Sequence, residues 1–250
     1  MKSCIVKDIV IGEGKPKICL PIVGQTDQEI MEIAQSFKEL EYDLVELRID
    51  FYNNILNDQC LLQLLKQLRA VIDKPVLLTY RSLKEGGQIQ LSDEQYLHLI
   101  DIACQSQMID LVDIELMSGN TLVYHLVEIA HQNSIKVIMS NHDFHQTPSR
   151  SELIERFEHM EILNADIYKI AVMPQSYKDV IELLNVTLEM SHKMDKPIVT
   201  MSMSQLGVIS RITGELTGSA ITFASAGKAS APGQIGVQDM NILLEAIHND

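Results

Sequence analysis

The chain has 250 residues, of which 46% are hydrophobic, so it can bury a full core, which excludes a disordered protein and a disulfide-stapled mini-protein. It carries 34 acidic and 20 basic side chains, a net charge of −14, and has no basic stripe that could follow a phosphate backbone. Nucleic acid and anionic membranes are therefore poor candidate partners, and one globular domain over residues 1–250 is expected.

No apolar run approaches the roughly 18 to 20 residues of a membrane-spanning helix, and the charged N-terminal residues lack the apolar core of a signal peptide. We therefore expect a cytoplasmic protein. The four cysteines are far apart and have no C-x-x-C spacing, so the sequence predicts buried thiols rather than disulfides or metal ligands: Cys4, Cys19, Cys60 and Cys104.

Residues 2–15 alternate apolar side chains ahead of Gly12 and Gly14, a pattern that predicts a short β-hairpin. After it, stretches typical of buried strands recur about every 29 residues, close to the roughly 30 residues of one βα unit. Eight such stretches follow one another: 17–23, 43–50, 75–80, 110–116, 135–140, 166–171, 197–203 and 219–224.

The segments between these stretches have apolar residues at helical spacing, as in Ile30, Ala34 and Phe37. Ser92 with Gln95, and Ser149 with Glu152, fit the capping box that begins a helix. Alternating β and α units of this number predict a closed (β/α)8 TIM barrel, with the hairpin closing its bottom. An open doubly wound sheet is disfavoured because no G-x-G-x-x-G follows the first stretch.

The catalytic side chains of a barrel lie at the C-terminal ends of its strands, so each strand end is a candidate site. Stretch 43–50 places Glu46, Arg48 and Asp50 on one face. Because helices cover a barrel outside and side chains fill it inside, these charges have no solvated face and must pair with other groups or bind a ligand.

The next two stretches add charges of both signs. Stretch 75–80 leads into Arg81, Glu85 and the pair Gly86-Gly87, which suits either a plain turn or a loop whose backbone approaches a ligand. In stretch 110–116, Asp113 and Glu115 lie on the same face of the predicted strand. These carboxylates could bind a metal or pair with the cations of neighbouring strands, and pairing is favoured because hard-cation sites gather more acidic ligands.

Stretch 166–171 carries one lysine, Lys169, among apolar residues. Burial lowers the pKa of a lysine and makes the neutral amine available, as a Schiff-base nucleophile requires; a structural lysine paired with Asp113 or Glu115 is the alternative. Stretch 135–140 runs into His142 and His145, either of which could transfer protons near neutral pH.

The last two units bring the remaining candidates. Met201 and Met203 form an apolar wall, and Arg211 has the fork geometry that binds a carboxylate. The small residues of 224–234 predict a lid that adds Ser230 and Gln234 to the barrel mouth. Four cations are then expected to converge in a locally cationic cleft: Arg48, Arg81, Lys169 and Arg211.

Taken together, these residues resemble the type I 3-dehydroquinate dehydratases, and the resemblance extends over essentially the whole chain. It rests on six segments: Glu46-Leu-Arg48-Ile-Asp50; Arg81 with Glu85-Gly-Gly; Ser140-Asn-His142-Asp-Phe144-His-Gln-Thr-Pro148; Tyr168-Lys169-Ile-Ala-Val-Met-Pro174; Met201-Ser-Met203 with Arg211; and Ser230-Ala-Pro-Gly-Gln234.

The resemblance implies a homodimeric barrel, without metal or cofactor, that converts 3-dehydroquinate to 3-dehydroshikimate and water in the shikimate pathway. Lys169 would form an imine with the C3 ketone, and His142 would move the protons. The other implied roles are orientation of His142 by Glu85, binding of the carboxylate by Arg211 with Ser230 and Gln234, binding of ring hydroxyls by Glu46, Arg48 and Arg81, and charge neutralisation by Asp113 and Glu115.

Two alternatives are a different Schiff-base lyase and a barrel without catalytic activity. A different Schiff-base lyase, such as an aldolase, would share the barrel, but such enzymes commonly hold a phosphate on glycine-rich loops after strands seven and eight, where this chain has Arg211 and the lid. A barrel that only binds a ligand would not need the full set of lysine, histidine and arginine side chains.

Overall fold

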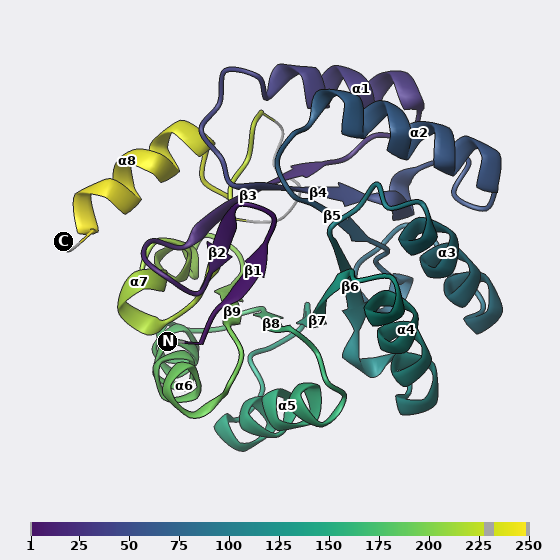
Figure 1. Cartoon of the computed structure of the whole chain (residues 1–250). Helices are drawn as coiled ribbons and strands as arrows, with labels where there is room; N and C mark the ends of the chain where they lie inside the picture. Colours follow the sequence, from purple (N-terminus) through teal and green to yellow (C-terminus); the bar gives the residue numbers. More distant parts are fainter. Residues whose placement is uncertain (1, 228–232, 249–250) are drawn as a thin grey trace.

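The computed structural model describes residues 2–227 and 233–248, and at its centre eight parallel strands form a barrel with the helices outside it (Figure 1). The strands are β3 (Lys17–Ile22), β4 (Leu44–Arg48), β5 (Val76–Thr79), β6 (Leu111–Glu115), β7 (Lys136–Asp143), β8 (Ile167–Val172), β9 (Ile198–Ser202) and β10 (Ile221–Phe223). Each falls on a predicted stretch, so the TIM barrel is confirmed. β7 runs beyond its predicted end and holds His142 within the strand.

The barrel closes where β9 meets β10. The strand order runs from β10 through β3 to β9, so β9 and β10 are the two edges of the sheet. An isolated parallel bridge joins Ile198 to Ser219, and the Thr200 amide donates to Ser219 Oγ at 2.9 Å. Ala220 N also donates to the Ile198 carbonyl at 2.8 Å. Closure thus satisfies edge groups that an open sheet would expose.

Helices surround the strands on all sides in Figure 1. They are α1 (Asp27–Ser36), α2 (Asp58–Val71), α3 (Asp93–Gln105), α4 (Asn120–Gln132), α5 (Arg150–Ile162), α6 (Tyr177–Lys193), α7 (Gly214–Thr217) and α8 (Val237–Ile247), with short 3-10 turns η1 (Ile49–Phe51), η2 (Leu83–Glu85), η3 (Leu116–Ser118) and η4 (Val208–Arg211). Both predicted capping boxes are present, and Ser176 with Asp179 forms a third at the start of α6.

Side chains alternate between the barrel interior and the helical layer. One phase of each strand packs on the helices, while the other forms a buried layer near the bottom that includes Leu77, Leu111 and Ile138. The antiparallel hairpin of β1 (Cys4–Val6) and β2 (Ile9–Ile11) joins this second cluster and lies across the strands in Figure 1. The predicted closure of the barrel bottom by the hairpin is confirmed.

An aspartate repeats at the bottom of three strand pairs, β3–β4, β5–β6 and β7–β8. Asp43, Asp110 and Asp166 stand just before β4, β6 and β8. Their Oδ2 atoms accept the first free amides of the preceding strands, from Ile18 at 2.7 Å, Val76 at 2.8 Å and Val137 at 2.9 Å. Each aspartate amide in turn donates to the carbonyl of the same residue. The repeat therefore ties neighbouring strands together at the end opposite the candidate site.

The cysteines are free thiols, as predicted, but their burial is not uniform. Cys4, Cys19 and Cys104 are buried, whereas Cys60 is partly exposed because it lies in the first turn of α2, beside the N-cap Asn57. Within the part of the chain that the structure describes, no helix combines the length and apolar character that crossing a membrane requires.

Candidate active site

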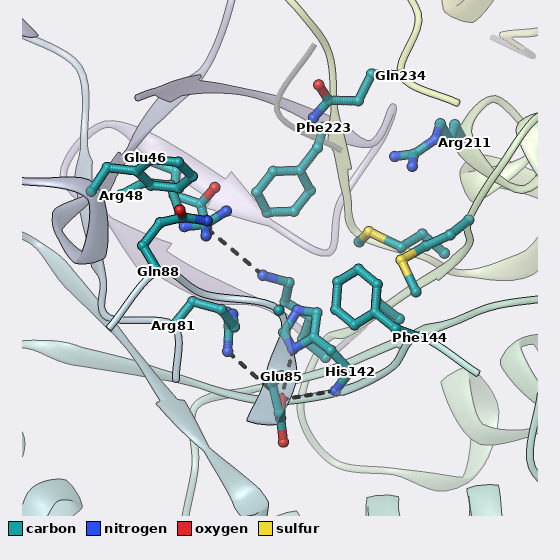
Figure 2. A pocket seen from close by; sticks show the side chains of 16 residues that line it. Glu46, Arg48, Arg81, Glu85, Gln88, His142, Phe144, Arg211, Phe223 and Gln234 are labelled. Carbon is teal, nitrogen blue, oxygen red and sulfur yellow. Dashed lines mark hydrogen bonds and ion pairs between the residues drawn. The ribbon is translucent and has the colours of Figure 1, made fainter. Parts of the chain in front are cut away.

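The candidate site is a cavity of about 200 Å³ at the C-terminal ends of the strands. In Figure 2, Glu46 and Arg48 lie on one side of it, Glu85 and His142 on another, and Arg211 and Gln234 near the top. The predicted residues that line it are Glu46, Arg48, Arg81, Glu85, His142, Lys169, Met201, Met203, Arg211 and Gln234. Strands far apart in sequence thus deliver their charged side chains to one small volume.

Lys169 reaches the cavity from β8 and is only 3% exposed. Its Nζ donates to Asp113 Oδ2 at 3.1 Å and lies 3.9 Å from Glu46 Oε1. The ammonium also lies 4.6 Å from the centroid of the Phe223 ring, a distance that favours a cation–π contact. The pairing with Asp113 is therefore present, and the same amine lines the cavity, where the role as a Schiff-base nucleophile stays a prediction.

Arg81 links the carboxylates of β6 to the rest of the site. Its guanidinium contacts Asp113 Oδ1 at 2.9 Å, Glu115 Oε1 at 3.0 Å and Ser140 Oγ at 2.9 Å. Burial disfavours its charge, but Asp113 and Glu115 outweigh burial and raise its pKa. Burial alone would raise the pKa of Asp113, because it disfavours the charged carboxylate. The charges of Arg81 and Lys169 outweigh this effect and hold the pKa of Asp113 below its usual value.

Asp113 and Glu115 form the ion pairs that the sequence favoured. Arg81, which follows β5, pairs with both carboxylates, and Lys169 of β8 pairs with Asp113. Glu115 also accepts the Ser82 amide at 2.8 Å. Over residues 2–227 and 233–248, no group of three or more His, Cys, Asp or Glu side chains is arranged to hold a metal ion. Both carboxylates lie behind the cavity wall rather than in it.

His142 and Glu85 form the second functional pair. His142 Nδ1 lies 2.8 Å from Glu85 Oε2, which also accepts the His142 amide at 2.9 Å. Burial lowers the pKa of His142 well below its usual value, and the charges of Arg81, Lys169 and Arg48 add to the effect. Burial and the nearby Glu115 raise the pKa of Glu85 to about 8. His145, the other candidate, is exposed and does not line the cavity.

The remaining polar wall comes from β4. Glu46 accepts a hydrogen bond from Thr79 Oγ1 at 2.8 Å. Arg48 forks onto Asp50, with Nε and one NH2 donating at 2.8 Å and 2.9 Å, and its guanidinium carbon lies 5.0 Å from the Phe51 ring centroid. Asp50 therefore holds the Arg48 side chain in place but does not itself line the cavity.

Arg211 ends η4 and is 2% exposed. Thr222 Oγ1 of β10 donates a hydrogen bond to the Arg211 carbonyl at 2.8 Å. Burial lowers the pKa of the Arg211 guanidinium to about 10, so this side chain stays charged at neutral pH. The predicted lid begins after β10, and its base is joined by the bridge between Ser225 and Gly236. Gln234 lines the cavity, whereas Ser230 lies outside the described residues.

The pair Gly86-Gly87 has a steric reason. Gly86 ends η2 with φ +86°, and a Cβ there would lie 2.6 Å from the Phe144 ring. A Cβ on Gly87 would lie 1.8 Å from the Arg81 carbonyl oxygen. The turn is therefore present, and Gly86 also lines the cavity, while the approach of this backbone to a ligand stays a prediction.

Sequence reasoning missed several residues of the site. Ser140 donates to Asp113 Oδ1 at 2.5 Å, and Thr79 supports Glu46. Both lie on the interior phase of their strands, two residues before His142 and Arg81, so alternation alone could have indicated them. The wall is completed by Phe51, Gln88, Phe144, Ala171 and Phe223.

Comparison with known proteins agrees with this geometry. The family model described as type I 3-dehydroquinase matches residues 18–250. The chain belongs to the type I 3-dehydroquinase family. The 3-dehydroquinate dehydratases of Listeria welshimeri and Salmonella agona are each 46% identical to it, with 99% of both chains covered.

Solved structures of family members share the whole fold. A type I 3-dehydroquinate dehydratase from Clostridium difficile, solved with covalent modified comenic acid, superposes with a TM-score of 0.96 at 44% identity, covering 99% of this chain and 98% of that one. The enzyme from Enterococcus faecalis gives a TM-score of 0.92 at 42% identity, covering 98% and 100%. The resemblance noted from sequence motifs is thereby confirmed at the level of the family.

Proposed function

We propose that the protein converts 3-dehydroquinate to 3-dehydroshikimate and water through an imine on Lys169, as a hydro-lyase of the shikimate pathway. The observation that carries this proposal is a buried lysine whose amine shares one small cavity with the imidazole of His142 and the guanidinium of Arg211. An amine, a base and a carboxylate-binding cation are what an imine-based elimination on a keto acid requires.

In the first step Lys169 gives a proton to His142 and its neutral amine adds to the C3 carbonyl. His142 returns the proton to the carbinolamine hydroxyl, which leaves as water and gives a protonated imine. Asp113, 3.1 Å from Nζ, is placed to balance the positive charge of this nitrogen. The protonated imine withdraws electrons from C2 and so acidifies the C2 hydrogen. The electron sink of the reaction is then the imine itself.

In the second step His142 Nε2 removes the C2 proton and leaves an enamine. The enamine electrons re-form the imine as the C1 hydroxyl departs, and His142 returns the proton to that hydroxyl, so the leaving group is water. Hydrolysis of the conjugated imine consumes one water and frees Lys169. The balance is one substrate giving one product and one water.

Substrate binding is assigned by charge and position. Arg211, cationic and buried, suits the substrate carboxylate, with Gln234 lining the same cavity and Ser230 proposed on sequence grounds alone. Glu46, Arg48 and Arg81 are proposed for the ring hydroxyls. The Clostridium difficile relative was solved with covalent modified comenic acid, which supports the proposal of covalent chemistry in this family.

Turnover of 3-dehydroquinate tests the proposal directly. The product has a carbon–carbon double bond conjugated with its ketone, so ultraviolet absorbance should rise when enzyme is added. An aldolase would cleave a carbon–carbon bond instead, and a binding protein would leave the absorbance constant. The homodimer and the cytoplasmic location stay predictions.

A further inference from the structure

We propose that Asn141 and Arg156, neither of which lines the cavity, are positioning residues that hold the Glu85 carboxylate as an acceptor for His142 and so keep His142 Nε2 in its basic form. The inference rests on the proposed function for its catalytic meaning. It extends the site through the barrel wall to helix α5.

The relay consists of two hydrogen bonds behind the Glu85–His142 pair. Asn141 precedes His142 in β7, and alternation directs its side chain away from the barrel interior. Asn141 Nδ2 donates to Glu85 Oε1 at 3.2 Å, and Arg156 NH1 of α5 donates to Asn141 Oδ1 at 2.6 Å. Glu85 thereby accepts bonds on both oxygens from two consecutive residues of one strand.

Chemistry fixes the direction of this relay. A guanidinium can only donate hydrogen bonds, so the amide oxygen of Asn141 faces Arg156 and its NH2 group faces Glu85. An asparagine can join a donor to an acceptor in this way, whereas an aspartate would direct a second carboxylate at Glu85. Arg156 therefore selects the amide orientation that makes Asn141 a donor.

The consequence for His142 is electrostatic. Nε2 is a base when the Glu85–His142 pair holds one proton, on Nδ1, and Glu85 is ionised. The other charged groups that face the pair are Arg48 of β4, Arg81 after β5, Asp113 and Glu115 of β6, and Lys169 of β8. The Asn141 bond lowers the Glu85 pKa against the larger effects of burial and Glu115, which raise it. Without these two hydrogen bonds, the Glu85–His142 pair should therefore keep its second proton up to a higher pH.

The test compares Arg156→Met with Arg150→Met, because both arginines lie in α5 and Arg150 pairs with the exposed Glu182 and Glu189. We expect R156M to lower kcat about 10-fold with little change in KM, and to move the acid limb of kcat/KM up by roughly half a pH unit or more. Arg156→Lys should restore much of both, and R150M should match the wild type. Equal kcat and pH profiles for R156M and R150M, or no recovery in R156K, would overturn the proposal.

Asn141→Asp provides a second variant of nearly unchanged shape. It keeps the contact to Arg156 but turns the donor facing Glu85 into an acceptor, so the acid limb should move up at least as far as in R156M. An unshifted acid limb in N141D would contradict the relay. Melting temperatures of all variants separate this effect from loss of the fold.

A readout without substrate separates the relay from the proposed function. The imidazole nitrogens of His142 can be followed by 15N NMR over pH, with signals assigned by their absence in His142→Ala. R156M and N141D should raise the midpoint of this titration, whether or not 3-dehydroquinate is the substrate. An enzyme that fails to turn over 3-dehydroquinate but shows this shift would refute the proposed function alone, and an unshifted titration would refute the relay alone.

Discussion

The hydrogen bond between His142 and Glu85 is the residue-scale feature on which the proposed proton transfers depend. Burial disfavours charge on both partners, raising the Glu85 pKa to about 8 and lowering that of His142. Because they share a proton 2.8 Å apart, the two groups titrate as one unit. Loss of the second proton from this unit exposes the lone pair on Nε2.

This coupling predicts how activity depends on pH. The kcat/KM of the wild type should rise with pH through a single limb that belongs to the pair. Glu85→Gln removes the carboxylate while Arg81, Lys169 and Arg48 continue to repel a proton on His142, so the limb should move to lower pH by roughly one unit, with a lower plateau. A limb that moves to higher pH in E85Q, or stays in place, would be inconsistent with the pair.

The division of labour between Lys169 and His142 gives a second residue-scale prediction. In His142→Ala the imine should still form, because Lys169 keeps its contacts to Asp113 and Glu46, but turnover should fall by roughly 10²- to 10⁴-fold. Borohydride should then trap substrate that has not lost water. His145→Ala is the matched control, since His145 is exposed, and recovery of unmodified H142A protein would contradict these roles.

At the scale of elements, the aspartate repeat joins paired strands at the barrel bottom. Asp166 is the most connected member, since it accepts from the Val137 amide, from Lys136 at 3.0 Å and from His131 at 2.9 Å. Burial opposes its charge, but the His131, Val137 and Lys136 contacts prevail and lower its pKa to about 2. A carboxyl with a depressed pKa stabilises the fold above its unfolded pKa and loses this contribution as the pH falls through the folded pKa.

Asp166→Asn should therefore lower the free energy of unfolding by about 2 kcal/mol at pH 7, from a shift of 3.8 to about 2. The difference from the wild type should shrink as the pH falls from 4 towards 2, because protonation removes the same charge from the wild type. Denaturant unfolding across this range measures it. Asp195→Asn, at an exposed position before β9, should have little effect, and a D166N penalty that persists at low pH would refute the electrostatic origin.

The elements also show what the sequence could and could not predict. Strand positions were predictable because buried stretches alternate regularly with helical ones, and the residues at strand ends therefore meet in one cavity. Asn141 and Arg156 were not predictable, because their contact depends on how α5 lies against β7. The role of Asp43, Asp110 and Asp166 was also missed, although each directly precedes a strand of the same repeat.

At the scale of the whole molecule, the acidic and basic side chains behind the net charge of −14 are unevenly distributed. The predicted cations do converge on the cavity, but the expectation of a locally cationic cleft needs correction. Arg48 is paired with Asp50, and Arg81 and Lys169 with the carboxylates of β6. The charges of this side are largely balanced, so Arg211 is the cation that we propose as the main partner of an anionic substrate.

The barrel explains why this arrangement is possible in an acidic protein. The hairpin and the apolar layer close the bottom, and the cavity that the charged side chains line lies at the C-terminal face. There, buried ion pairs hold Lys169 between Asp113 and Glu46. The central claim of the proposed function is that this amine bonds covalently to the substrate.

Borohydride reduction in the presence of 3-dehydroquinate tests that claim most directly. Intact-mass analysis should show one adduct, equal to the substrate or its dehydrated product less one oxygen atom, and peptide mapping should place it on Lys169. Lys169→Ala should give neither adduct nor turnover, while Lys136→Ala, at a half-exposed lysine outside the cavity, should give both. Absence of an adduct on the wild type, or an adduct on any other lysine, would contradict the account.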